Sequence, residues 1–114
     1  MKDLIRTMKA LSDPNRITVM KMLEVRELCV CEITAILGLA QSTVSKHLKL
    51  LEDAGLIKSQ RDGAWVIYRL AEKQDNPYAP VMQQHLKEWL TEDDHIRDNV
   101  AKIATIDRLR ICAA

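Results

Sequence analysis

Apolar residues recur at helical spacing in the middle of the chain, on both sides of a short turn. Val44, Leu48 and Leu51 stand at i, i+4 and i+7, which places them along one face of an α-helix. The apolar stretch 32–37 before the turn predicts a helix of one to two turns that ends at Gly38. Gly38 opens a stretch of about three residues, the turn length that a helix-turn-helix needs. The pattern therefore predicts two short helices joined by a sharp turn.

The outer face of the second predicted helix is polar, and only its far end is acidic. Short hydroxyls, an amide and amines near a helix N-terminus can reach phosphates and base edges together, whereas a merely solvated helix usually carries Glu and Lys pairs. We therefore predict a DNA-recognition helix, with an ordinary helical hairpin as the alternative. The candidate DNA contacts on it are Gln41, Ser42, Thr43, Ser45, Lys46, His47 and Lys49.

The segment that follows this helix has the alternation of a β-hairpin. Residues 56–61 and 64–70 are two predicted strands around an Asp62-Gly63 turn. A hairpin directly after a recognition helix is a wing, and Arg61 and Arg69 could contact the phosphate backbone beside the groove. The predicted fold is mainly α with a small β-hairpin wing, a winged helix-turn-helix.

Further helices flank this unit on both sides. Residues 4–11 form an amphipathic helix, and Asp13-Pro14 caps and begins the next one. Residues 72–76 are polar and predict a linker. The C-terminal residues 76–114 predict apolar helices, the later one capped by Thr91, which we interpret as dimerisation helices rather than a stripe that folds back onto its own core.

Composition sets limits on the class of protein. A chain of 114 residues, 47% hydrophobic, predicts a single domain, residues 1–114, with a small core that pairing into a homodimer would enlarge. The net charge of +1 gives no global attraction to nucleic acid. Between residues 38 and 70, however, five basic residues face three acidic ones, and a dimer would double that local surplus of two.

Several other classes lack their sequence features. No phosphate loop, paired-carboxylate cleft or nucleophile elbow is present, and the three histidines form no close ligand cluster, so no enzyme is predicted. No apolar run approaches the ~20 residues of a membrane span, and no secretion signal precedes the first helix, so we expect a cytoplasmic protein without a membrane partner. Three cysteines in a reducing compartment argue against a disulfide framework.

Cys29 and Cys31 stand where a short extended piece is predicted to meet a helix. In extended backbone they point to the same side, ~6.6 Å apart along the strand, and a small rotation at the helix start would turn both sulfurs toward one ion. A helix N-terminus also lowers the pKa of a thiol. The pair therefore predicts capture of a soft ion by thiolates.

Together these stretches resemble the ArsR/SmtB family of winged-helix metal sensors, and within it the arsenic-responsive repressors. The resemblance covers residues 8–70 and rests on ALSDPNRITVMKML, ELCVCEI, QSTVSKHLKLLEDAGLI and the wing ending in VIYRL. It implies a homodimer with the first and last helices at its interface and the recognition helix in the major groove of an operator at a resistance operon. It also implies that As(III) or Sb(III) is the effector, and that DNA binding itself needs no cofactor.

The effector site that the resemblance implies is incomplete in one position. In the arsenic branch a third cysteine follows the C-V-C motif, which Cys29 and Cys31 match, but Thr34 stands in its place here. Two thiolates could suffice, Cys112 could supply the third from the same chain or across the dimer, or an exogenous thiol or water could complete the shell. We favour two local thiolates, with Cys112 as an additional candidate ligand.

Other effectors and roles remain as alternatives. Two thiolates would also suit Cd(II) or Pb(II). A thiol redox sensor would need a bond from Cys29 to Cys112, or one between chains, because an i, i+2 disulfide is geometrically poor. A zinc site like that of other family members is not predicted, since Asp93 or Asp94 with His95 lacks its second half at Ile106 and Leu109. A winged helix that binds only proteins would fit the nearly neutral total charge.

Overall fold

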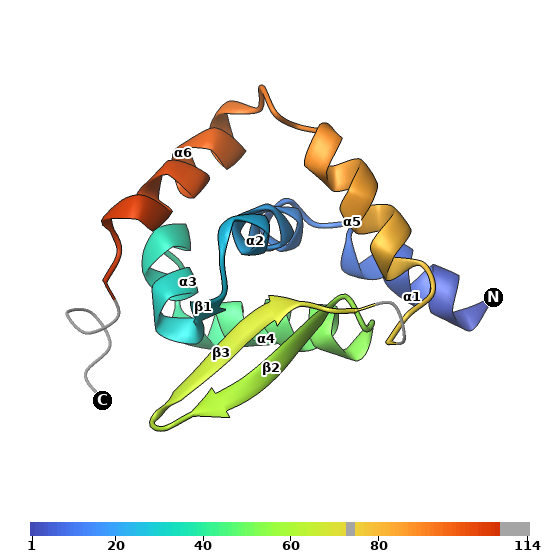
Figure 1. Cartoon of the computed structure of the whole chain (residues 1–114), viewed down its shortest axis with the longest axis horizontal. Helices are drawn as coiled ribbons and strands as arrows, with labels where there is room; N and C mark the ends of the chain where they lie inside the picture. Colours follow the sequence, from blue (N-terminus) through green and yellow to red (C-terminus); the bar gives the residue numbers. More distant parts are fainter. Residues whose placement is uncertain (73–74, 108–114) are drawn as a thin grey trace.

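The computed structural model describes residues 1–72 and 75–107, and this part of the chain combines helices with one small antiparallel sheet (Figure 1). In chain order the elements are α1 (Lys2–Ala10), α2 (Pro14–Val25), β1 (Leu28–Cys29), α3 (Val30–Leu37), α4 (Gln41–Asp53), β2 (Ile57–Asp62), β3 (Trp65–Leu70), α5 (Ala79–Glu88), α6 (Asp94–Lys102) and the 3-10 turn η1 (Ile103–Thr105). The mainly α architecture with a β-hairpin is the predicted one. None of the described helices is long and apolar enough to cross a membrane.

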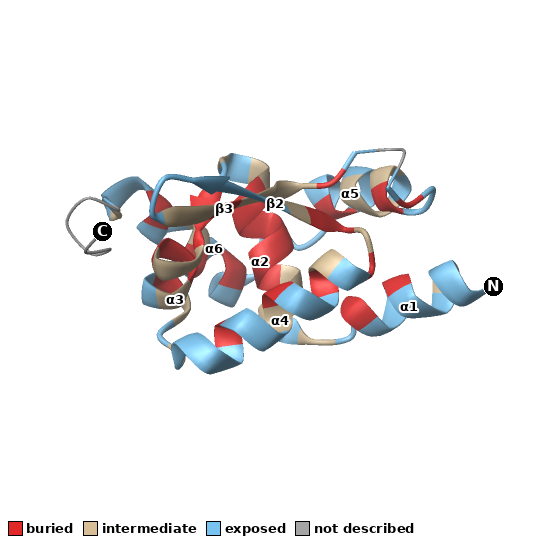
Figure 2. Ribbon diagram, turned by 90° about the horizontal axis from the view of Figure 1, so that it is seen from below, coloured by how far each residue is buried: buried red, intermediate tan, exposed pale blue. Residues whose placement is uncertain are grey.

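Helix α2 lies at the centre and is buried over most of its length (Figure 2). Val19, Met20 and Met22 are almost completely shielded from solvent. The helix begins where predicted because the Asp13 carboxylate accepts hydrogen bonds from the backbone N–H groups of Asn15 (2.9 Å) and Arg16 (3.1 Å). A well-capped central helix gives the surrounding elements a fixed surface to pack on.

The helix-turn-helix pair forms as predicted, with one shifted boundary. Val44, Leu48 and Leu51 of α4 are fully buried. Gly38 ends α3 in the left-handed conformation, with φ +67°, which costs glycine little because it lacks Cβ. Helix α3 begins at Val30, two residues before the predicted start, so it follows β1 without a break.

The wing belongs to a three-stranded sheet in the order β1-β3-β2. The predicted Asp62-Gly63 turn is wrong by one residue, because Asp62 pairs with Trp65 and the loop is therefore Gly63-Ala64. Gly63 has φ +62°, so the residue that tolerates positive φ takes the first loop position. The third strand, β1, has only two residues, too few to show an alternating pattern in the sequence.

The predicted linker 72–76 lies between β3 and α5, but it includes one buried polar residue, Asn76, which is only 3% exposed. The amide nitrogen donates to the Thr7 hydroxyl (2.8 Å) and to the Ala54 carbonyl (2.7 Å), and the amide oxygen accepts from the Tyr78 N–H (2.8 Å). Asn76 thereby joins α1, the end of α4 and the start of α5, which is a role for a polar residue that local sequence cannot distinguish from solvation.

The C-terminal helices differ from their prediction in two respects. The cap of α6 is Asp93, whose carboxylate accepts from the Ile96 N–H (3.0 Å), and not Thr91. In addition, Val100 and Ile103 pack into the main core, so the α6 stripe folds back onto its own chain. By contrast, α5 and the residues after it leave Val81 and Trp89 about half exposed. The exposed apolar surface of this region therefore belongs to α5 and the residues directly after it.

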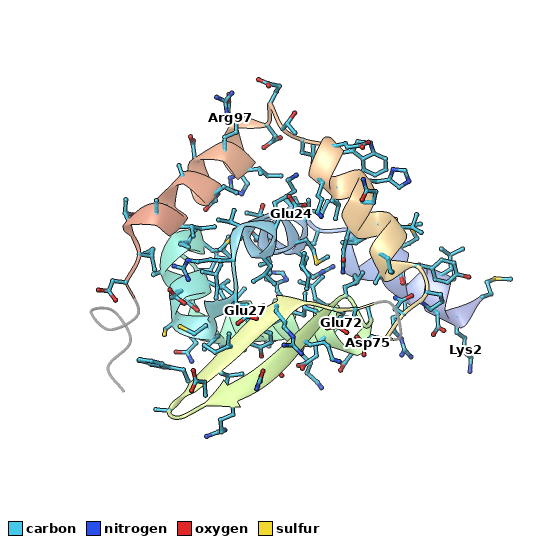
Figure 3. All side chains as sticks on the ribbon, viewed as in Figure 1. Lys2, Glu24, Glu27, Glu72, Asp75 and Arg97 are labelled. Atoms are coloured by element: carbon cyan, nitrogen blue, oxygen red, sulfur yellow. The ribbon has the colours of Figure 1, made fainter. Side chains whose placement is uncertain are left out.

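A buried lysine attaches the end of α5 to α2. The Lys21 ammonium donates to the carbonyls of Leu86 and Trp89 and forms an ion pair with Glu24 (3.2 Å), while its side chain is only 7% exposed. Figure 3 shows Glu24 on the side of α2 that faces α5 and α6. A cation is favoured at this position because the last carbonyls of a helix carry partial negative charge.

Candidate nucleic-acid interface and cysteine pair

The polar face of α4 is open to solvent along the outer surface of the molecule (Figure 2). The exposed candidates on it are Gln41, Ser42, Thr43, Ser45, Lys46 and Lys49. Lys49 lies 3.5 Å from the Asp53 carboxylate, but both side chains are more than half exposed, so solvent screens the pair and leaves the lysine available. Six of the seven predicted α4 contacts therefore share one accessible face.

His47, the seventh predicted contact, is half-buried and faces the body of the protein. Its Nδ1 lies 3.2 Å from the Arg16 guanidinium and 3.8 Å from the Asp13 carboxylate. Arg16 also donates to the backbone carbonyls of Ala10 (2.6 Å) and Lys9 (3.2 Å), so it provides hydrogen-bond donors for carbonyls at the C-terminal end of α1. His47 and Arg16 together connect α4 to the α1–α2 turn. The sequence could not indicate this contact because the two residues are far apart in the chain.

The two wing arginines differ in their availability to a ligand. Arg61 is exposed on β2. Arg69 is half-buried, and its Nε is buried without a hydrogen-bond partner among the described residues. The base of the wing is attached to α4, since the Ser59 hydroxyl donates to the Glu52 carboxylate (2.6 Å). Burial and, to a smaller extent, the Glu52 charge raise the pKa of Tyr68 above its ordinary value, so its phenol stays neutral near pH 7.

The two predicted cysteine ligands meet where β1 joins α3. Cys29 ends β1 and is fully buried, Cys31 lies in the first turn of α3, and their sulfurs are 3.0 Å apart. The backbone rotation expected at the helix start has brought both sulfurs to one point. Thr34 does not extend this pair, because its hydroxyl donates to the Val30 carbonyl (2.7 Å). Cys112 lies outside the described residues.

Glu32 holds the backbone of Cys29 in place at the junction of β1 and α3. It is 1% exposed, and its carboxylate accepts from the Cys29 N–H (2.9 Å) and from the Arg26 guanidinium (3.1 Å). The spacing of a capping residue and an acid three positions later could have predicted the first contact. Among residues 1–72 and 75–107, no three His, Cys, Asp or Glu side chains gather into a metal site.

The fold is a winged helix-turn-helix, the class of protein that presents one helix to DNA. It consists here of a short helix, a three-residue turn, an exposed polar helix and a β-hairpin. The sequence pattern of the family described as "Bacterial regulatory protein, arsR family" matches residues 13–59. The chain belongs to this family, whose members are transcriptional regulators and not enzymes.

Relatives and a solved structure extend this match over most of the chain. The arsenical resistance operon repressor of Escherichia coli is 32% identical over 103 residues, which cover 88% of this chain and 84% of the relative. A cadmium resistance regulatory protein, the CadC homologue of Staphylococcus aureus, is 38% identical over 60% of this chain and 57% of its own. A homodimeric winged helix-turn-helix DNA-binding domain from Mycobacterium bovis has a TM-score of 0.64 and 26% identity, with 82% of this chain and 87% of that chain covered.

Proposed function

We propose that this family member is a homodimeric repressor that binds operator DNA and is released when As(III) or Sb(III) binds Cys29 and Cys31. The observation that carries the proposal is the pair of sulfurs 3.0 Å apart at the start of the helix that precedes the recognition helix. Two thiolates that share one ion at the ~2.3 Å typical of zinc–sulfur bonds lie less than ~4.6 Å apart at any bond angle, so the pair already satisfies this limit.

The choice of As(III) or Sb(III) rests on ligand chemistry and on the relatives. Thiolates select soft ions over ions that prefer oxygen. A relative matching most of this chain is an arsenical resistance repressor, whereas another is a cadmium resistance protein, so Cd(II) is the second candidate effector. Cys112, from either chain, or an exogenous thiol would complete the coordination shell.

The dimer would place two recognition helices one DNA turn apart, ~34 Å, against a palindromic site. Exposed apolar side chains of Ile5 and Met8 on α1 and Val81 on α5 supply surface for the partner, and the similar M. bovis domain is a homodimer. The exposed α4 residues would enter the major groove, and Arg61 would contact the backbone.

Effector binding has to supply enough free energy to change the state of the repressor. Converting a repressor population that is 99% DNA-bound into one that is 99% free needs ~5.5 kcal/mol of differential affinity of the effector for the two states. A surface ion pair cannot provide this free energy, whereas metal–thiolate bonds can. They would form at Cys31, in the first turn of α3, so a change there reaches α4 through the packing of the two helices.

An effector titration tests this proposal. The full-length protein is bound to a fluorescent duplex that it has itself selected from a random-sequence pool, and arsenite, Sb(III), Cd(II), Zn(II) or peroxide is added. We expect release by arsenite and Sb(III) at the lowest concentrations. Release by Cd(II) alone would assign the cadmium alternative, release by peroxide alone would assign the redox alternative, and no release by any of them would contradict the proposal.

The DNA interface makes a separate prediction about affinity and specificity. Lys46→Ala should weaken binding to every duplex and lower the slope of log K against log salt by about 1, because one phosphate contact is lost. Gln41→Ala should weaken binding to the selected duplex by ~1–3 kcal/mol and leave random DNA almost unaffected, because an amide reads base edges. Anisotropy titrations at several salt concentrations measure both. Equal losses on both duplexes in both variants would contradict this division.

A further inference from the structure

The wing is hydrogen-bonded to the strand that ends in the first cysteine. In the antiparallel pair of β1 and β3, Cys29 is opposite Ile67 and Leu28 is opposite Tyr68. Strand β3 is the middle strand of the sheet, so its other edge carries β2 and the exposed Arg61. Cys29 and the wing are therefore parts of one sheet, whose hairpin Figure 1 shows below α2.

A small apolar cluster, separate from the main core, joins the same two parts. Cys29 (0% exposed) and Ile67 (8% exposed) form it, and Cys31 and Trp65 pack against it. Both cysteines thus share their surroundings with residues of β3. Packed interiors do not absorb added volume without displacement, so an ion held by the two sulfurs has to move some of these neighbours.

The pairing of β2 with β3 connects this cluster to Arg61, a predicted DNA contact. On β2, Gln60 is opposite Ile67, and the next residue, Arg61, is opposite Val66. A strand ladder transmits a shift in register or twist to its partner because each residue pair is hydrogen-bonded or in direct contact. The strand pairs therefore connect Cys29, through Ile67 and its neighbours on β3, to the segment of β2 that carries Arg61, and this connection does not include α3 or α4.

We propose that Ile67 and Trp65 are positioning residues of the effector site, and that the wing is a second DNA contact which the effector withdraws in parallel with the recognition helix. This proposal rests on the proposed function, because it assumes that the cysteines hold the effector. It adds that part of the allosteric coupling between effector and DNA is carried by Arg61.

The test compares the ratio of DNA dissociation constants with and without arsenite in three proteins. Arg61→Ala and Lys49→Ala each remove one exposed cation, from the wing and from α4, and both should weaken binding without arsenite. In Arg61→Ala we expect the arsenite-induced ratio to fall at least ~3-fold below that of the wild type, because the wing contribution is already absent. In Lys49→Ala the ratio should fall by a clearly smaller factor.

Fluorescence gives a second measurement that a merely structural role would not affect. Trp65 is one of only two tryptophans in the sequence. Arsenite should change the emission of the wild-type protein with the midpoint seen for DNA release, and the change should be absent in Trp65→Phe and in Cys29→Ser. The wing proposal would be overturned if arsenite changed the DNA dissociation constant of Arg61→Ala as much as that of the wild type, or if the emission change persisted in Trp65→Phe. The proposed function would still stand in either case, provided that arsenite releases the wild-type protein from DNA. If arsenite fails to release the wild type, both proposals fall.

Discussion

Cys29→Ser and Cys31→Ser should each retain operator binding within about 3-fold and raise the arsenite concentration for half-release at least ~100-fold, equivalent to ~2.8 kcal/mol. Serine keeps the size of cysteine nearly unchanged, so the junction of β1 and α3 should stay intact. It cannot supply the thiolate that a soft ion requires. Anisotropy titration of the preformed DNA complex with arsenite measures the midpoint directly.

Two further variants complete this experiment. Thr34→Ser lies one turn along α3 and keeps the hydroxyl that bonds to the Val30 carbonyl, so it should respond to arsenite like the wild type. Cys112→Ser should also respond if the two local thiolates suffice, and should shift the midpoint if Cys112 is a third ligand. Wild-type midpoints in both Cys29→Ser and Cys31→Ser would place the effector elsewhere.

Leu48→Ala should lower the free energy of unfolding by ~2–5 kcal/mol, the range for removing a fully buried leucine side chain. Leu48 is 0% exposed and attaches the middle of α4 to the core. Domains of this size are stable by only ~5–15 kcal/mol, so the loss is a large fraction of the total. Urea denaturation at one protein concentration should show a lower midpoint with an unchanged m-value.

The same helix provides the matched control. Leu50→Ala is the same chemical change two residues away, at a side chain that is 49% exposed. Its cost should remain under ~1 kcal/mol, as for surface substitutions in general. Equal destabilisation by the two variants would mean that α4 is not anchored through the Val44, Leu48 and Leu51 face.

Local sequence predicted those features whose cause lies within a few residues. The burial of Val44, Leu48 and Leu51 follows from helical spacing, and the end of α3 follows from a glycine that adopts positive φ. The start of α2 follows from a carboxylate one residue before a proline. The prediction failed for the start of α6, because Thr91 and Asp93 are both good caps and local sequence does not choose between them. In the structure Asp93 is the cap, and Ile96, whose N–H it accepts from, is buried.

The pair of cysteines shows the limit of local pattern more clearly. The spacing of Cys29 and Cys31 predicted that their sulfurs could meet, and they do. Their neighbours Ile67 and Trp65 lie far along the chain, and only the pairing of β1 with β3 brings them to the site. A two-residue strand has no alternation of its own, so its place in the sheet depends on the partner strand.

The sequence by itself determined the two helices of the DNA-binding unit, the hairpin after them and the two sulfurs at the start of α3, because helical period, turn residues and ligand spacing are properties of neighbouring positions. Tertiary structure alone decided that His47 faces Arg16, that Asn76 is buried, and that the wing shares a sheet with Cys29. Each of these depends on which distant surfaces come into contact when the chain buries its apolar area, and no local pattern encodes that choice.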